Sequence, residues 1–235
     1  RISFFITGFV VLVVFFAPWF VTKEQFTPIT PQALKPMGEL MHKIPNVKLI
    51  VVMFITTMIV QSSVMSIDPI VSLYVKELMH NQGNIAFVAG VVAATPGLGT
   101  LVAASKVGHT MDRIGPLKVL IWGLLIATLL FVPMIFTKSP WHLAFWRFLL
   151  GLANAALLPA AQTILTLDVP QEAFGRVFSY NQSFQAAGSV LGSVMGSMIS
   201  GVYSYSAVFA VTGFTLLVNL GLVLLFRGKK TTPTN

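Results

Sequence analysis

Residues Val177 to Phe226 have the sequence VFSYNQSFQAAGSVLGSVMGSMISGVYSYSAVFAVTGFTLLVNLGLVLLF, and none of these 50 residues is charged. A helix that rises about 1.5 Å per residue needs about 20 apolar residues to cross a bilayer, so this run is long enough for two crossings. Glycine, serine and two tyrosines at 201–206 favour a tight turn at a membrane interface. The run therefore predicts two transmembrane helices joined by a short outer hairpin.

Five further charge-free runs are each long enough for one crossing. They are Ile2 to Thr22, Leu49 to Ile67, Leu78 to Ser105, Val119 to Thr137 and Phe148 to Leu167. The composition agrees, because 55% of the 235 residues are hydrophobic and only 9% are charged, whereas soluble domains carry roughly 25% charged residues. The sequence predicts an all-α membrane protein with seven spans.

The positive charges lie mainly at one set of span ends. Eleven basic residues are expected on one face, namely Lys23, Lys35, Lys43, Lys48, Lys106, Arg113, Lys118, Arg176, Arg227, Lys229 and Lys230, against Arg1, Lys76 and Lys138 on the other. Cytoplasmic loops carry such an excess, so we expect a multi-pass protein of the inner (plasma) membrane with the N-terminus of this chain outside and its C-terminus cytoplasmic. The net charge of +8 then faces anionic lipid, and no nucleic-acid partner is needed to explain it.

A proline-rich polar stretch divides the chain. It follows the first span and carries Pro28, Pro31, Pro36 and Pro45, which suit a linker. We therefore expect a first helix at 1–22, a linker at 23–47, a six-helix transmembrane domain at 48–228 and a tail at 229–235. The chain starts directly at a span without methionine, which predicts preceding chain in a larger protein.

The inner loop between the third and fourth spans contains the most specific motif. From Gly108 to Lys118 it reads GHTMDRIGPLK. Asp112 is expected to accept backbone N–H groups at a helix start, Gly115 to adopt a positive φ and Pro116 to begin the next helix. On physical grounds this predicts a turn of two or three residues.

This loop resembles the cytoplasmic motif that major facilitator superfamily transporters carry between the second and third helices of each six-helix half. The matching residues are Gly108, Asp112, Arg113, Gly115 and, as the following cation, Lys118. Pro116 replaces the usual basic residue after the second glycine. Residues 147–155 and 168–176 also resemble segments of the second triplet of a half, although Leu150 replaces a frequent glutamine. The resemblance implies the C-terminal six-helix bundle, made of two three-helix inverted repeats, preceded by the last helix of the N-terminal half at 1–22 and the central cytoplasmic linker.

Asp68 and Arg147 are the two opposite charges expected within the spans. Asp68 lies about 30 Å along its helix from Lys48, and Arg147 lies about 9 Å from an outer entry near Trp141, so both belong to the outer part of the membrane. If Asp68 and Arg147 pair with each other, neither remains an unpaired charge in the low dielectric of the membrane, which would be costly. We expect an ion pair that acts as a gate or as a proton- or cation-coupling site, with Pro69 as a hinge.

Two alternatives remain for these charges. The pair can be a fixed structural ion pair at the interface. Arg147 can instead extend its side chain to the outer interface.

The sixth span carries polar and small residues on one helical face. Asn181, Gln185, Gly188, Gly192 and Gly196 follow one another at steps of 4, 3, 4 and 4. The glycines predict close packing with another helix, whereas Asn181 and Gln185 can line an aqueous cavity. Gln61 and Asn154 lie on the first helices of the two triplets, which the resemblance implies line the substrate cavity.

The sequence gives no sign of an enzyme. It contains no H-E-x-x-H, G-x-S-x-G or phosphate-binding loop, and its four histidines have no metal-ligand spacing, so we expect no metal and no cofactor. The resemblance is strongest to the drug:proton antiporter branch, because a sugar-porter P-E-S-P-R signature is missing near the linker. It implies efflux of drug-like or lipophilic solutes by alternating access, driven by a proton gradient, with the bilayer, the N-terminal half and a small-molecule substrate as partners. The alternatives are uptake of a sugar or small metabolite and, more distantly, a seven-span receptor.

Overall fold

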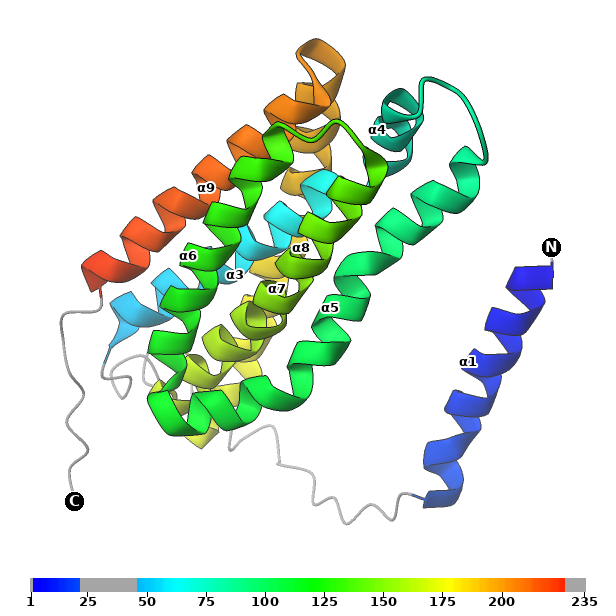
Figure 1. Ribbon diagram of the computed structural model, residues 1–235. Helices are drawn as coiled ribbons and strands as arrows, with labels where there is room; N and C mark the ends of the chain where they lie inside the picture. Colours follow the sequence, from blue (N-terminus) through cyan, green and yellow to red (C-terminus); the bar gives the residue numbers. More distant parts are fainter. Residues whose placement is uncertain (1, 22–45, 227–235) are drawn as a thin grey trace. The chain divides into compact units, whose positions relative to one another are not determined.

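The computed structural model describes residues 2–21 and 46–226 (Figure 1). The chain divides into two units, Arg1–Glu39 and Leu40–Asn235. The described part of the first unit is helix α1 (Ile2–Val21), which contains the apolar segment Phe4–Phe16. The predicted linker, apart from its last two residues, and the predicted tail lie outside the described residues.

Every secondary-structure element in the described part of the second unit is a helix. The elements are α3 (Val47–Ile67), α4 (Val71–Leu78), α5 (Ile85–Ile114), α6 (Pro116–Ile135), α7 (Pro140–Asp168), the short 3₁₀ turn η2 (Gln171–Ala173), α8 (Phe174–Val202) and α9 (Tyr205–Phe226). Five of these helices, α3, α5, α6, α7 and α9, are long and apolar enough to cross a membrane. The sixth long helix, α8, has 29 residues and carries the predicted polar face. The six long helices form one bundle in Figure 1, and the all-α prediction is confirmed.

The third predicted span begins later than its charge-free run. Residues 71–78 form the separate helix α4, and the turn that follows has positive φ at His80, Asn81 and Gly83. Asn84 then caps α5, because its Oδ1 accepts a hydrogen bond of 3.2 Å from the Phe87 N–H. Residues 78–84 are uncharged, but they form the end of α4 and the turn that follows it. They therefore do not belong to the span.

The helices pair in a way that follows the two triplets. α3 packs mainly on α8, and α5 packs mainly on α7. The first helix of each triplet thus contacts the second helix of the other triplet, while the third helices, α6 and α9, contact each other. This exchange of partners is the arrangement expected of two inverted three-helix repeats.

Glycines allow the first of these pairings to be very close. A Cβ atom on Gly188, Gly192 or Gly196 would overlap the backbone of α3. The opposing α3 residues are Met58, Ser62 and Ser66, whose carbonyl oxygens lie closest. The predicted glycine face of α8 is therefore the face that packs on α3.

A second close contact joins α5 to α7. A Cβ on Gly99 would overlap the backbone at Phe148, and one on Gly151 would overlap the backbone at Pro96. The Thr100 hydroxyl also donates a hydrogen bond of 3.1 Å to the Gly151 carbonyl. The two equivalent helix pairs of the repeat thus both depend on glycine.

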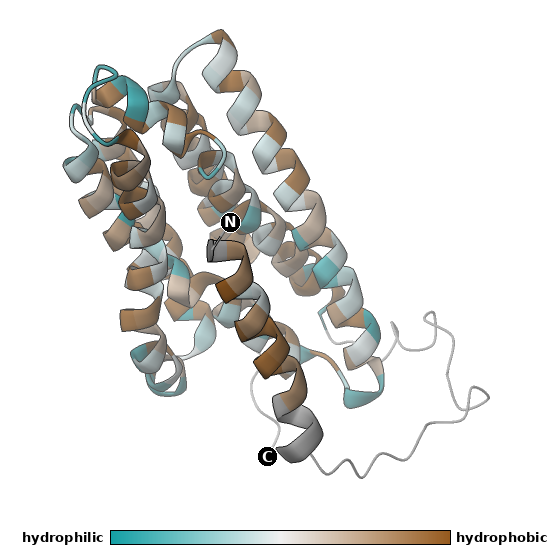
Figure 2. Ribbon diagram, turned by 90° about the vertical axis from the view of Figure 1, so that its right-hand side faces the viewer, coloured by the Kyte–Doolittle hydropathy of each residue, from teal (hydrophilic) through white to brown (hydrophobic). Residues whose placement is uncertain are grey.

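Hydrophobic residues, brown in Figure 2, recur along the helices, and many of the large ones are exposed. Leu101, Phe136 and Leu225, for example, are 74%, 73% and 82% exposed. Apolar patches of this extent are rare on proteins that face water. The surface fits a bundle surrounded by lipid.

Candidate functional site

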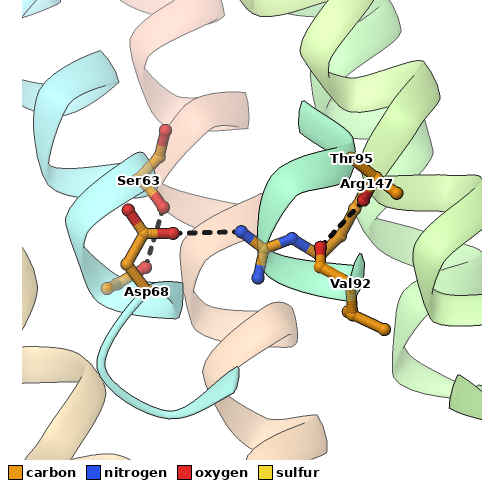
Figure 3. Close-up of polar contacts among 6 residues, drawn as sticks. Ser63, Asp68, Val92, Thr95 and Arg147 are labelled. Carbon is orange, nitrogen blue, oxygen red and sulfur yellow. Dashed lines mark hydrogen bonds and ion pairs between the residues drawn. The ribbon is translucent and has the colours of Figure 1, made fainter. Parts of the chain in front are cut away.

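An ion pair joins Asp68, just after the C-terminal end of α3, to Arg147 in the N-terminal part of α7. The Arg147 guanidinium points toward Asp68 in Figure 3, and its Nη2 donates to the Asp68 Oδ1 at 3.0 Å. The Arg147 side chain is only 4% exposed, whereas that of Asp68 is 48% exposed. The buried cation thus has a carboxylate partner that still reaches the surroundings.

Helix α3 ends immediately before the Asp68 carboxylate. α3 ends at Ile67, and the Ile70 N–H donates to the Ile67 carbonyl at 3.0 Å, which closes a tight turn of four residues. Pro69 has no N–H to continue the α-helical pattern. Asp68 therefore lies at a break between α3 and α4, a sharper interruption than the hinge within one helix that the sequence suggests.

Gln61 and Asn154 lie on the same two helices, each about two helical turns from the charged residue and toward the middle of the bundle. Gln61 comes seven residues before Asp68, and Asn154 comes seven residues after Arg147. Because seven residues are about two helical turns, each lies below the charged residue of its own helix by about 10.5 Å. Both are half-buried, so the structure places two polar levels along the α3–α7 contact.

Two buried atoms along this contact have no hydrogen-bond partner within the described part of the chain. They are Nη1 of Arg147, a donor, and Oδ1 of Asn154, an acceptor. Buried polar groups usually pair with protein or with ordered water. These two atoms are therefore available to a water molecule or a ligand.

Asn181 and Gln185 lie within the α3–α8 contact. The Thr57 hydroxyl donates to the Asn181 Oδ1 at 2.7 Å, and Asn181 is 1% exposed. Gln185 is 8% exposed, and its buried Nε2 has no partner among the described residues. A similar bond, from Thr56 to the Asn219 Oδ1 at 3.1 Å, links α3 to α9.

The inner loop motif forms a turn of a single residue. α5 continues to Ile114, and α6 starts at Pro116. Gly115 between them has φ +88° and ψ 145°, and its N–H bonds to the Met111 carbonyl at 2.9 Å.

Asp112 belongs to the last turn of α5, and no side chain caps α6. The prediction that Asp112 caps a helix start is wrong, because the reversal at Gly115 leaves no position from which Asp112 precedes α6. The other motif residues, Gly108, Arg113 and Lys118, are exposed around this turn.

The model of the Major Facilitator Superfamily matches residues 50–235, which include all helices from α5 to α9 and nearly all of α3. The chain belongs to the major facilitator superfamily. The resemblance inferred from the inner loop motif is thereby confirmed, and the seven-span receptor alternative falls away.

Curated members of the superfamily share close sequence similarity with the chain. Multidrug resistance protein MdtG of Citrobacter koseri is 46% identical over 219 residues, which are 93% of this chain and 54% of that protein. The proteins of the same name from Salmonella arizonae and Salmonella newport are each 44% identical over the same shares. The chain spans about half the length of these relatives.

Membership in the superfamily bears on the polar residues of α8. Substrates of such transporters bind near the midplane between two repeats or halves. Asn181 and Gln185 are buried in the contact between α3 and α8, and their role in a substrate cavity stays a prediction. The reason for their burial is visible in the spacing, because both share the helical face of the glycines that contact α3.

The sequence did not identify two further contacts between helices of this superfamily member. Tyr74 of α4 is buried, and its hydroxyl donates to the Thr137 carbonyl at 3.0 Å. Burial raises the pKa of the Tyr74 phenol above its ordinary value, so it remains a neutral donor. The hydroxyls of Ser66 and Thr212 share a second bond, at 3.0 Å, between α3 and α9. A single tyrosine or serine carries no spacing signal, so only the structure reveals these contacts.

Replacing Gly115 with alanine tests the one-residue turn. Its φ of +88° with an extended ψ is a conformation that residues with a Cβ rarely adopt, so we expect a loss of about 1–3 kcal/mol of stability. The measurement is the thermal unfolding midpoint of the purified full-length protein. Gly108→Ala is the matched control, because Gly108 is helical with open space around it, and its midpoint should stay the same or rise slightly, since alanine favours a helix more than glycine does. Equal midpoints for the two variants would contradict the turn.

Proposed function

We propose that this chain is the C-terminal half, with one preceding helix, of a proton-coupled transporter that exports lipophilic, drug-like solutes by alternating access. The observation that carries the proposal is the Asp68–Arg147 pair, in a chain closely similar to proteins named for multidrug resistance. The other half of the transporter would be the partner of the six-helix unit. We also propose that the proton gradient supplies the energy and that the inner loop faces the cytoplasm.

The exposure of the two charges suggests which one takes the proton. Arg147 is enclosed, whereas half of the Asp68 side chain is exposed and can exchange protons with its surroundings. Protonation of Asp68 would remove the charge that balances the buried guanidinium. An unpaired buried charge is costly, so protonation would favour a different arrangement of the outer ends of α3 and α7.

The helix break gives this change a place to occur. The turn at 68–70 separates α3 from α4, so the two helices can shift relative to each other without bending α3. α4 is held by the bond from Tyr74 to Thr137 at the end of α6. A change at Asp68 would therefore be transmitted to the outer end of the bundle, as a gate requires.

The second polar level is the proposed substrate contact. Gln61 and Asn154 are half-buried, and Asn154 offers an unpartnered oxygen. They lie about two helical turns inward from the gate, closer to the midplane where superfamily substrates bind. A lipophilic solute with one polar group suits a mainly apolar site with few polar contacts.

The test is transport by the full-length protein in proteoliposomes, with and without an imposed pH gradient. The panel contains lipophilic cations and sugars. We expect a lipophilic cation to move against its gradient only when the pH gradient is present, and sugars not to move. Sugar accumulation without a response to lipophilic cations would contradict the proposal and favour uptake.

A further inference from the structure

A crevice of about 410 Å³ lies among α5, α6 and α7. Its lining includes Val102, Lys106 and Thr110 of α5, Trp122 and Ile126 of α6, and Ala156 of α7. The three helices approach one another around it, because Gly99 packs on α7 and Gly123 packs against Leu157. The crevice is therefore a fixed feature of the packing.

The crevice opens to the surroundings of the bundle. Among its lining residues, Val102 is 58%, Trp122 59% and Ile126 47% exposed. Apart from Lys106 and Thr110, the lining is apolar or aromatic. In a bilayer, an open apolar crevice of this kind is a place for a hydrocarbon chain.

A cation lies in the wall of the crevice. Lys106 is its only charged lining residue, and it has no ion-pair partner among the described residues. It lies eight residues, or about 12 Å, from the inner end of α5 at Ile114, and Trp122 lies about 9 Å from the start of α6. Tryptophan prefers the headgroup level of the membrane, so Lys106 is at a depth where its ammonium group reaches lipid phosphates.

The neighbouring loop has the same sign of charge. Arg113 and Lys118 are exposed on either side of the Gly115 turn, with Asp112 as the one acidic residue between Lys106 and Lys118. Three cations against one anion give this end of the crevice a positive balance. The cytoplasmic leaflet carries anionic lipids, which such clusters attract.

Another face of α5 is better suited to helix packing. Gly90, Gly97 and Gly108 have open space beside them, and at about 100° per residue they lie roughly opposite Lys106 and Thr110. Small residues favour close contact with another membrane helix. If the other half of the transporter docks on this face of α5, the crevice on the opposite face stays open to lipid.

We propose that the crevice binds an anionic phospholipid of the inner leaflet. One acyl chain lies between α5 and α6 against Ala156, and the phosphate contacts the Lys106 ammonium group. The bound lipid fills the space that separates the inner half of α5 from α7. It is a site distinct from the ion pair and independent of the transported solute.

The test is native mass spectrometry of the purified full-length protein titrated with phosphatidylglycerol or with phosphatidylcholine of the same acyl chains. We expect tighter binding of phosphatidylglycerol. Lys106→Gln should weaken it about fivefold, the effect of one lysine near a membrane surface, and should leave phosphatidylcholine unchanged. Lys138→Gln, in the loop that follows α6, is the charge control and should have no effect.

A second variant tests the acyl chain contact. Ala103→Phe places a ring in the crevice and should weaken the binding of both lipids, whereas Ala210→Phe on the exposed face of α9 should not. Unchanged phosphatidylglycerol binding in Lys106→Gln, or in Ala103→Phe, would overturn the proposal. So would displacement of the lipid by tetraphenylphosphonium, because a cation should be repelled by Lys106 and its competition would make the crevice a substrate site.

Discussion

Asp68→Asn is expected to abolish the response of transport to a pH gradient, with a loss of at least about tenfold in gradient-driven flux. The substitution keeps the shape of the side chain and removes the carboxylate of the ion pair, the group to which we assign the proton. It also leaves the Arg147 cation, 4% exposed, without its counter-charge. The cost should be less than the roughly 3–5 kcal/mol of a fully buried broken pair, because the Asp68 side chain is 48% exposed. The measurement is drug flux in proteoliposomes at several pH gradients.

Two further variants separate coupling from folding. Glu77→Gln removes an exposed carboxylate from nearby α4 and should leave the flux unchanged. The double variant Asp68→Asn with Arg147→Gln removes both charges, so its thermal unfolding midpoint should return toward that of the wild type while coupling stays absent. If the double variant regains coupled transport, the pair is a structural ion pair and the gate proposal is wrong.

Gly192→Leu is expected to destabilise the protein by about 3 kcal/mol or more, because the new side chain has no space. Even a Cβ at this position would overlap the backbone of Ser62 on α3. Backbone atoms cannot move aside as a flexible side chain can, so α3 and α8 would have to separate. At about 2–4 °C per kcal/mol, the thermal unfolding midpoint should fall by about 6–12 °C or more.

The control is a glycine of the same helix that faces open space. Gly201→Leu, near the end of α8, meets no atom within 4 Å of its Cβ and should leave the midpoint within about 2 °C of the wild type. A similar fall in both variants would show that α8 responds to the loss of glycine itself and not to contact with α3.

The ion pair could be predicted from the sequence because the prediction needs only the rise of a helix and the positions of the charges. A helix has a nearly constant rise, and the spans contain very few charges, so counting residues from Lys48 and Trp141 placed Asp68 and Arg147 at one depth. The glycine face of α8 was predictable for the same reason, because helical spacing determines which residues share a face. The helix partners were not predictable, since the face does not reveal which neighbour it meets.

Other features depend on local backbone structure, which the distribution of charged residues does not predict. The run from Leu78 to Ser105 is uncharged, yet its first residues end α4 and form a turn with positive φ at His80 and Asn81. Asp112 has the residue type of a helix cap but lies inside α5 because Gly115 alone reverses the chain. Asn181 has a polar side chain typical of a cavity but satisfies it within the α3–α8 contact.

Proton exchange on substrate binding tests the central claim most directly. The full-length protein, first brought to an acidic pH in weakly buffered detergent solution so that protonation opens the pair, should release protons as a lipophilic cation that it transports binds and the Asp68–Arg147 pair forms again. Asp68→Asn should bind the same cation and release none, because the proton leaves from Asp68. Equal proton release by the wild type and Asp68→Asn, at equal binding, would contradict the account.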